Sequence, residues 1–422
     1  MSPSAVQEHV DDISTSTKLV PELSSEADFS TFRSLVPLLA DKNLTYLNAS
    51  YQPPSNLIVH GAITKFTSDA LYDPHPKPQW QNAVEETRTL VGRYISADPS
   101  SLAFTRDTTE ALGCFIRSLK FEPGDNVVVL DTEHPNHVYG WMALRKAGLE
   151  IRQVPTIPAA KETGHVTAAN AATFAPYVDE RTKAIGLSSI MFHSGQWNNV
   201  ADICATYRPR GIHVLADLTQ QVGFADVDVR ALGVSAAAFS LHKGLNCPTG
   251  FAVLYVDPEF IADTDPTPPI VGFGAVSNVR ADLLVPSDEV VYHPSARRYE
   301  HLNLSLISAA AAKAFLTFYL DSMGPERVQE HLYRLGDMLR EECRGLGVKI
   351  VGPSGRKDHA PHLYILDLHD PRWMSLLKEK GVLATPYRLG IRISFGFYNN
   401  SSDVKRLAEA LKAGLEAGLP LP

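Results

Sequence analysis

The feature that most restricts how this chain can fold is a series of short apolar runs that alternate with segments of helical periodicity. These runs are bounded by polar, glycine or proline residues and lie at Asn126–Leu130, Ala184–Leu187, His213–Ala216, Ala236–Phe239 and Phe251–Val256. Helices are predicted over Gln79–Tyr94 and Glu110–Leu119. Strands without polar alternation are buried on both faces, as in parallel sheets covered by helices. The sequence therefore predicts an α/β domain with a largely parallel sheet.

The pattern changes after residue 300, where two long helices are predicted over Leu306–Met323 and Glu326–Leu346. A smaller α+β unit is completed by strands at Val348–Val351, Leu363–Leu368 and Arg392–Phe395 and by a closing helix at Asp403–Leu415. The predicted organisation is an N-terminal arm at 1–44, a large domain at 45–300 and a small C-terminal domain at 301–422. The polar arm is expected either to pack on a neighbouring molecule or to stay mobile.

Composition excludes several classes of protein. With 44% apolar and 20% charged residues, the chain has enough apolar side chains for a core and is not intrinsically disordered. Its 39 basic and 47 acidic residues give a net charge of −8, which predicts no nucleic-acid partner. No apolar run approaches the roughly twenty residues that span a bilayer, and the start lacks the pattern of a secretory signal. A soluble, cytoplasmic protein without a membrane partner is expected.

The cysteines and the missing motifs narrow the chemistry further. Cys114, Cys204, Cys247 and Cys343 are scattered, with no C-x-x-C pair, and no metal site is predicted. The chain contains no G-x-x-x-x-G-K-[ST], no G-x-G-x-x-G after a strand, no H-E-x-x-H and no G-x-S-x-G. We therefore do not expect P-loop phosphate binding, Rossmann-type hydride transfer, or a zincin or serine-hydrolase mechanism.

Ionisable residues instead follow the ends of predicted strands, at the sheet edge where α/β proteins bind ligands. Lys243 lies just beyond Ala236–Phe239, and Asp217 follows His213–Ala216. A partly desolvated amine forms Schiff bases, and a carboxylate can hold a proton on a pyridine nitrogen, with Gln220 near the ring's phenolic oxygen. Taken alone, Lys243 is more simply explained as a solvated loop lysine, and Asp217 equally well as a helix N-cap.

An anion site is predicted where Thr108 and Thr109 open a helix after Asp107, because free N–H groups and the helix dipole favour negative charge. Ser240 and His242 would add hydrogen-bond donors. A helix start with a capping side chain explains the same pattern without any ligand.

Two further residues are candidates for contacts with small molecules. His134 follows the strand Asn126–Leu130, where its imidazole can stack on a planar cofactor, although a loop histidine is more often solvated. Arg392 lies in a predicted strand of the small domain. Its guanidinium suits bidentate capture of a substrate carboxylate and suits a structural salt bridge equally well.

The order of these segments resembles the class V (cysteine-desulfurase-like) family of fold-type I pyridoxal-phosphate enzymes. The segments that carry the resemblance are Asp217-x-x-Gln220-x-x-Gly223, Ser240-x-His242-Lys243 and Arg392-x-Ser394-x-x-x-Tyr398-Asn399. The family's phosphate turn resembles Thr105-x-x-Thr108-Thr109-Glu110-Ala111, and its ring-stacking histidine resembles Glu133-His134. Its N-terminal signature is similar to Tyr46-Leu47-Asn48-Ala49. The match covers roughly residues 45 to 415, and chance matches would not keep the order.

The resemblance implies a mostly parallel seven-stranded sheet sandwiched by helices, with pyridoxal 5′-phosphate bound to Lys243 as a Schiff base. It implies Asp217 on the pyridine nitrogen, Gln220 on the phenolic oxygen and His134 over the ring. Phosphate contacts would come from Thr108, Thr109, Ser240 and His242, and substrate contacts from Arg392 and Asn48. The implied catalytic residues are Lys243, Asp217 and His134. A homodimer with the active site at the subunit interface is also implied.

Departures from the family's pattern bear on the reaction. Desulfurases carry a persulfide cysteine shortly before the substrate arginine, but here the last cysteine, Cys343, lies well before Arg392, so desulfurase activity is not expected. The segment Arg298–Asn303 lacks the threonine that reaches the partner's phosphate, and whether Asn303 replaces it stays open. Around Met191–Gln196, family members often have an asparagine near the cofactor, and Phe192 or its neighbours would reshape that pocket. These differences resemble the isopenicillin-N-epimerase-like branch, which includes carbon–sulfur lyases and cyclising enzymes of fungal alkaloid pathways.

The function implied is therefore that of a pyridoxal-phosphate enzyme acting on an amino acid through an external aldimine and a Cα carbanion. A lyase or carbon-bond-forming, cyclising enzyme of specialised, alkaloid-type metabolism is favoured. Aminotransferase or epimerase activity is the alternative within the same chemistry. A cofactor-less interaction protein is disfavoured because Lys243 and Asp217 are both present.

Overall fold

The central element of the fold is a seven-stranded sheet. The computed structural model describes residues 29–40, 43–163, 166–282 and 289–422. The strands are β2 (Leu102–Thr105), β3 (Asn126–Leu130), β4 (Glu150–Val154), β5 (Thr182–Ser188), β6 (His213–Asp217), β7 (Ala236–Ser240) and β8 (Ala252–Val256). They lie in the order β2-β8-β7-β6-β5-β3-β4, and β8 pairs antiparallel with both of its neighbours while the other pairs are parallel. The predicted mostly parallel sheet is confirmed.

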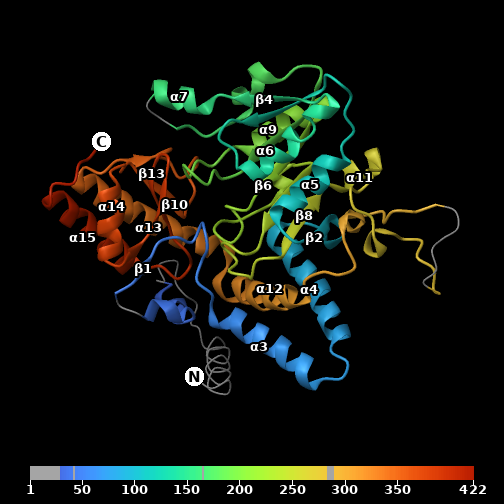
Figure 1. Ribbon diagram of the computed structural model, residues 1–422, viewed down its shortest axis with the longest axis horizontal. Helices are drawn as coiled ribbons and strands as arrows, with labels where there is room; N and C mark the ends of the chain where they lie inside the picture. The colour runs from blue at the N-terminus through green and yellow to red at the C-terminus, as the bar shows by residue number, and fades with distance from the viewer. Residues whose placement is uncertain (1–28, 41–42, 164–165, 283–288) are drawn as a thin grey trace.

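Both faces of this sheet are buried under helices (Figure 1). In β3, Val127 and Val129 belong to one apolar cluster, whereas Val128 and Leu130 belong to another. The first cluster includes residues of α5 (Thr108–Ser118), α6 (Pro135–Met142) and α11 (Pro258–Thr264). The second includes residues of α4 (Lys77–Ile95), α9 (Val200–Tyr207), α10 (Val229–Leu232) and α12 (Leu306–Phe318). Strand residues therefore alternate between two cores, which explains why the central strands are apolar throughout.

The C-terminal part of the chain forms a separate antiparallel sheet. Its strands are β9 (Ile350–Val351), β10 (Leu363–Leu366), β12 (Thr385–Tyr387) and β13 (Gly390–Ser394), in the order β12-β13-β10-β9. The helices of this part are α13 (Pro325–Leu346), α14 (Pro371–Glu379) and α15 (Ser401–Glu416). The predicted α+β character of the C-terminal unit is confirmed. The domain boundaries at 44/45 and 300/301 stay predictions; α12 packs against α4 and α3 (Leu57–Tyr72).

The start of the described chain joins these two parts. In residues 29–40, Phe29, Phe32 and Leu35 are buried, and Arg33 pairs with Asp403 of α15 at 2.8 Å. The expectation of an arm that packs on a neighbour or stays mobile is therefore wrong for residues 29–40, because their apolar side chains complete the chain's own core. Residues 1–28 and 41–42 of the predicted arm lie outside the described residues. Further on, β1 (Thr45–Tyr46) pairs in parallel with β11 (Val382–Leu383).

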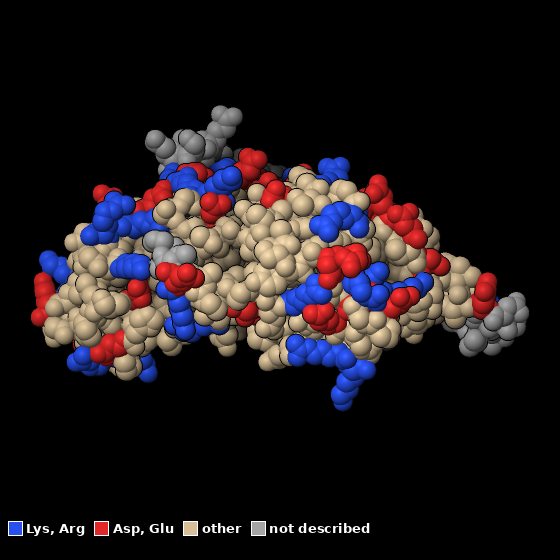
Figure 2. Space-filling view, turned by 90° about the horizontal axis from the view of Figure 1, so that it is seen from above, with Lys and Arg blue, Asp and Glu red and all other residues tan. Residues whose placement is uncertain are grey.

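The outer surface carries charges of both signs. Figure 2 shows Lys and Arg intermingled with Asp and Glu over the face that it presents, with no large area of one sign. Within the described part of the chain, none of the helices has the length and apolar character needed to cross a bilayer.

Candidate active site

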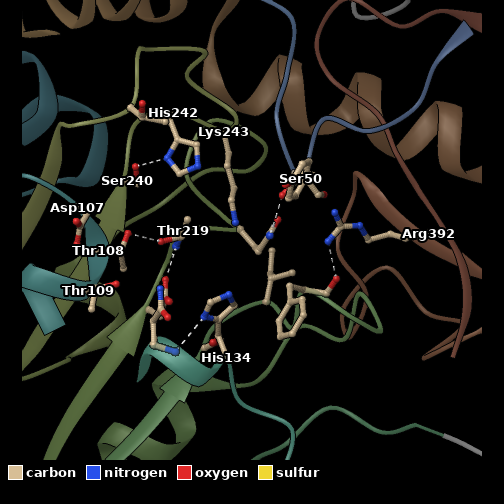
Figure 3. Close-up of a pocket in the computed structure, with 18 of the residues that line it drawn as sticks. Ser50, Asp107, Thr108, Thr109, His134, Thr219, Ser240, His242, Lys243 and Arg392 are labelled. Carbon is tan, nitrogen blue, oxygen red and sulfur yellow. Dashed lines mark hydrogen bonds between the residues drawn. The ribbon is translucent and has the colours of Figure 1, made fainter. Parts of the chain in front are cut away.

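The carboxyl ends of the parallel strands open into a cavity of about 350 Å³. Ligand pockets in proteins begin at about this size. Polar side chains predicted from the sequence point into it from the large domain, and Arg392 faces them from the small domain (Figure 3). The lining residues are Ser50, Tyr51, Asp107, Thr108, Thr109, His134, Asn136, Ser188, Ile190, Phe192, Asp217, Thr219, Gln220, Ser240, His242, Lys243, Thr249, Gly250, Tyr387 and Arg392.

Lys243 is held at the cavity by a close approach of two backbone segments. It follows β7, and a side-chain carbon on either Gly223 or Gly244 would collide with the backbone of the other glycine. Gly223 has a φ of +81° and donates its N–H to the Tyr94 hydroxyl at 2.7 Å. Glycine is required here because only a backbone without Cβ allows this approach. The loop that carries Lys243 is thereby fixed against the turn that follows β6.

The environment of Lys243 favours its neutral amine. The side chain is half-buried, and burial lowers the pKa of Lys243 to about 8. The guanidinium of Arg392 acts in the same direction, while the Asp217 carboxylate partly opposes it by stabilising the ammonium form. An amine whose pKa lies near neutrality is suited to nucleophilic attack and to moving a proton.

Asp217 ends β6 and is fixed by the turn that follows. Its Oδ1 accepts a hydrogen bond from the Thr219 backbone N–H at 2.8 Å. The helix N-cap considered for this carboxylate is wrong, because a turn and not a helix follows β6. The hydroxyls of Thr219 and Thr108 lie 3.1 Å apart. This contact joins the turn after β6 to the first residue of α5.

The start of α5 combines a side-chain cap with free donors. Asp107 is the N-cap and accepts from the Glu110 N–H at 2.8 Å, so the capping explanation of this segment is correct. Thr108 and Thr109 still line the cavity, together with Ser240 and His242 of the lysine loop. Hydroxyl groups and a helix N-terminus are donors that suit a phosphate. Cap and anion site therefore coexist.

His134 and the residues behind it form a fixed group. The His134 Nδ1 accepts from the Asn136 N–H at 3.2 Å, which leaves the proton of the neutral ring on Nε2. Burial lowers the pKa of His134, so the neutral imidazole is favoured. Behind it, the Glu133 carboxylate accepts from the N–H and the hydroxyl of Ser188, at 2.8 and 2.6 Å. Burial raises the pKa of Glu133 to about 7.

Gln220 is held from two sides by segments outside the large sheet. Its Nε2 donates to the Ser50 carbonyl at 3.2 Å, and its Oε1 lies 3.5 Å from His362 Nε2. The His362 ring is itself stacked on Phe224, with centroids 3.8 Å apart. The amide of Gln220 is thus oriented by contacts that the sequence motif did not predict.

Arg392 presents an open fork to the cavity. Its Nη1 donates to the Phe192 carbonyl at 3.1 Å, whereas Nε and Nη2 are buried without a partner within the described part of the chain. The guanidinium lies 4.3 Å from the centre of the Tyr387 ring. Burial lowers the pKa of Arg392. Buried guanidinium donors without partners are costly, and a carboxylate satisfies them in a bidentate manner.

Nine of the ten predicted site residues meet in this cavity; Asn48 does not. Asn48 is buried, and its Oδ1 accepts from the Thr385 hydroxyl at 2.7 Å. Its backbone bridges to Ser394 of β13, so it holds the N-terminal segment against the small domain and does not line the cavity. The expected substrate contact of Asn48 is therefore not supported. Asn303 does not line the cavity either, and its expected role stays open.

The cavity also contains residues that the sequence did not single out. Ser50 and Tyr51 come from the N-terminal segment, Ser188 from the end of β5 and Tyr387 from the end of β12. None belongs to a recognisable motif, although Ser188 could have been found as the residue that ends a buried strand. The four cysteines are all buried and none lines the cavity. No cluster of metal-ligating side chains is found within the ranges that the structure describes.

A family model named Aminotransferase class-V matches residues 72–407, which is most of the chain. The chain belongs to the class V aminotransferase family. The resemblance inferred from the site motifs is thereby confirmed. Members of this family work with pyridoxal 5′-phosphate, and this is the cofactor of the protein.

Several proteins are similar to this chain over most of its length. An uncharacterized aminotransferase of Schizosaccharomyces pombe is 50% identical over 93% of this chain and 98% of its own length. A probable cysteine desulfurase of Methanothermobacter thermautotrophicus is 27% identical, over 89% of this chain and 96% of its own length. The isopenicillin N epimerase of Streptomyces clavuligerus is 25% identical over the same shares of the two chains.

A solved structure has the same fold. A mutant of C-DES, with glycine covalently linked to its PLP cofactor, superposes with a TM-score of 0.80 at 20% identity. The match covers 90% of this chain and 98% of the C-DES chain. The fold-type I architecture is therefore confirmed.

The residues at the cavity fit pyridoxal phosphate. Lys243 offers an amine, Asp217 a carboxylate for the ring nitrogen, and Gln220 an amide for the phenolic oxygen. The donors at the start of α5 suit the phosphate group. The buried N–H groups of Arg392 remain available for a second, carboxylate-bearing molecule.

Proposed function

We propose that the protein binds an α-amino acid with its carboxylate on Arg392 and its amine toward Lys243, and that it then breaks a bond at Cα. The observation that carries this proposal is the meeting of three groups in one cavity: the Lys243 amine, the Asp217 carboxylate and the open fork of Arg392. The three groups come from different segments, since Asp217 ends β6, Lys243 follows β7 and Arg392 lies on β13. Their convergence makes a solvated loop lysine and a structural salt bridge poor explanations.

The chain's residues have distinct tasks in this proposal. When bound, pyridoxal phosphate supplies an aldehyde that condenses with amines and a ring that withdraws electrons from Cα. Asp217 holds a proton on the ring nitrogen, which strengthens that withdrawal. Lys243, with a pKa of about 8, takes the proton from Cα and returns it. The neutral His134 imidazole covers the ring and helps to exclude water.

For the later steps we propose a lyase or bond-forming reaction, in which a group leaves the substrate side chain. Sulfur transfer through an enzyme persulfide is disfavoured because burial raises the pKa of Cys114, Cys204 and Cys343 to about 12, and none of these thiols reaches the cavity. Tyr51 and Tyr387 line the cavity, and a phenolic hydroxyl is a suitable proton donor for a leaving group. A place in specialised, alkaloid-type metabolism stays a prediction.

Amino transfer is the second candidate, and the name of the S. pombe relative favours it. Epimerisation, named in the S. clavuligerus relative, would require a second proton donor on the face of Cα opposite Lys243. The three reactions share the first proton transfer. In a lyase reaction a side-chain group then leaves, whereas amino transfer and epimerisation differ in the atom that is protonated afterwards.

We also propose that the protein is a homodimer. Exposed apolar side chains gather on the segment at 266–282 and 289–302, which extends away from the body at the right of Figure 1. They are Ile270, Val271, Phe273, Val279, Val290, Val291 and Leu302. An extended apolar surface of this kind is typical of an interface between subunits.

The experiment that tests the amino-acid chemistry uses the protein loaded with pyridoxal phosphate. The wild type is expected to absorb visible light through its lysine-bound cofactor, and the Lys243→Ala variant is expected to lose that band. Candidate amino acids are then incubated in deuterated water while product masses are recorded. Loss of a side-chain fragment supports a lyase, conversion of the cofactor to its amine form supports amino transfer, and deuterium at Cα alone supports epimerisation. A colourless protein that exchanges no Cα proton would contradict the proposal.

A further inference from the structure

Three aromatic rings form a wall between the two ends of the proposed substrate site. The Phe192 ring meets the His134 ring edge-to-face at 5.1 Å and the Tyr387 ring edge-to-face at 5.9 Å. Phe192 also gives its carbonyl to Arg392. The wall therefore runs from the imidazole beside the cofactor to the guanidinium that receives the carboxylate. A substrate held at both Lys243 and Arg392 has its Cα next to these rings.

The charged side chains of the cavity are already engaged. Within the described residues that line it, they are Asp107, Asp217, Lys243 and Arg392. Asp107 caps α5, and Asp217 accepts from the turn after β6. In the proposed function, Lys243 receives the amine and Arg392 the α-carboxylate. Apart from the second oxygen of the Asp107 carboxylate at the start of α5, no charged group that this chain contributes to the lining is left to pair with a charged substrate side chain.

The other titratable groups nearby do not supply a counter-charge. Burial lowers the pKa of His134, and burial lowers the pKa of His242 to about 4, so both rings are neutral at physiological pH. Arg388 neighbours Tyr387 in sequence but is exposed and does not line the cavity. A charged substrate side chain buried beside Phe192 and Tyr387 would find no opposite charge there from this chain, and burying an unpaired charge is costly.

We infer that the substrate is an α-amino acid with an uncharged, apolar side chain, and that the Phe192–Tyr387 wall selects it. This inference rests on the proposed function and adds the substrate class to it. Aromatic rings contact aliphatic, aromatic and thioether groups favourably. Phe192 is a specificity-determining residue in this scheme, since it touches the substrate side chain without taking part in proton transfer.

The test is a binding titration that follows the visible absorption of the cofactor-loaded enzyme. The probes are L-norleucine against L-lysine and L-norvaline against L-glutamate, because each pair shares a carbon chain and differs in a terminal charge. L-Alanine reports on binding of the amine and carboxylate alone. The neutral member of each pair is expected to bind at least about 100-fold more tightly than the charged member.

Variants assign the selection to the wall. In Phe192→Ala, the affinity for norleucine is expected to fall about tenfold while alanine binds as before. The ratio of the norleucine affinity to the lysine affinity should decrease accordingly. Phe192→Leu, which keeps an apolar side chain, should retain most of the ratio. Tyr72→Ala, at an exposed aromatic residue outside the cavity, is the matched control and should change neither value.

The outcomes separate the inference from the proposed function. Comparable binding of lysine and norleucine, or of glutamate and norvaline, would overturn the substrate class while leaving the proposed function intact. An unchanged ratio in Phe192→Ala, with alanine still binding, would overturn the role of the wall. If no amino acid, alanine included, alters the spectrum, the proposed function fails and the inference fails with it.

Discussion

The ε-amine of Lys243 is the group on which the chemistry depends, and its surroundings set the pH at which it acts. An ordinary lysine has a pKa of about 10.4, whereas burial lowers that of Lys243 to about 8. The neutral amine is the nucleophile, so its population rises as the pH increases through this lowered pKa.

We expect the rate at which cofactor-free protein captures added pyridoxal phosphate to rise with a midpoint near pH 8. Stopped-flow absorbance across the neutral to alkaline range measures this, with Lys243→Ala as the blank. A rate that is still climbing at the pKa of an ordinary lysine would contradict the assigned environment.

Arg392 provides a second prediction at the scale of single residues. Replacing Arg392 by Lys keeps the positive charge but removes the planar guanidinium, which donates two parallel hydrogen bonds to a carboxylate. A hydrogen bond to a charged group is worth about 1.5–3 kcal/mol, so substrate affinity should fall roughly 10- to 100-fold. Spectral titration with L-norleucine measures the change, and n-pentylamine, which lacks the carboxylate, is the control. An equal loss for both compounds would show that Arg392 acts on something other than the carboxylate.

The sequence was sufficient to predict the residues that follow strand ends. Lys243, Asp217 and His134 were found because each comes shortly after an apolar run, and the carboxyl ends of parallel strands meet at one edge. Tyr51 and Tyr387 could not be found in this way. They reach the cavity through the N-terminal segment and the β12–β13 hairpin, whose positions depend on packing between distant parts of the chain.

Among the elements, α4 is attached to the large sheet by a buried ion pair. Arg88 of α4 donates to both carboxylate oxygens of Glu300, with its shorter contact at 2.6 Å. The same guanidinium donates to the Leu102 carbonyl, and Glu300 accepts from the Phe104 N–H, so both charged groups also hold β2. Both side chains are almost fully buried. Each buried charge is therefore compensated mainly by the other.

Removing one partner of this pair is expected to be strongly destabilising. Glu300→Ala removes the buried carboxylate of Arg88 and leaves the guanidinium only the half-exposed Glu85 as a charged partner, so the free energy of unfolding should fall by about 3 kcal/mol. Asp321→Ala is the matched control, since Asp321 pairs with Arg93 of the same helix at the surface. That change should cost less than about 1 kcal/mol. Urea unfolding followed by circular dichroism compares the two variants; equal losses would show that the buried pair contributes no more than the exposed one.

Prediction of the elements succeeded where burial leaves a clear pattern. The strands β3, β5, β6, β7 and β8 lie within a few residues of their predicted positions because each is buried on both faces. Two edge strands were missed: β2 has only four residues, and β4 alternates between buried and exposed positions. The helix α3 was also missed, and Val59 is its single fully buried residue. Weak burial leaves a weak pattern in the sequence.

At the scale of the whole molecule, the large and the small sheet are joined by short stretches of chain that lie far from each other in sequence. The parallel pairing of β1 with β11 and the contact of Arg33 with Asp403 bring the N-terminal segment to the small domain. The same segment then passes the cavity at Ser50, where its carbonyl accepts from Gln220. The N-terminal segment thus connects the small domain to the cofactor side of the site. Local sequence patterns carry no signal for this arrangement, because each contact joins residues from distant parts of the chain.

The proposed dimer is the remaining prediction at this scale. Light scattering on the purified protein should give twice the mass of the chain. A double change, Val290→Asp with Val291→Asp, places two charges on the exposed apolar segment, and we expect it to shift the protein to monomers at micromolar concentration, since a buried interface does not accommodate unpaired charges. Leu421→Asp is the control: it adds a charge at the C-terminal end, on the opposite side of the molecule in Figure 1, and should leave the mass unchanged. A wild-type protein that is monomeric, or a dimer that persists in the double variant, would show that this segment is not the surface through which two copies associate.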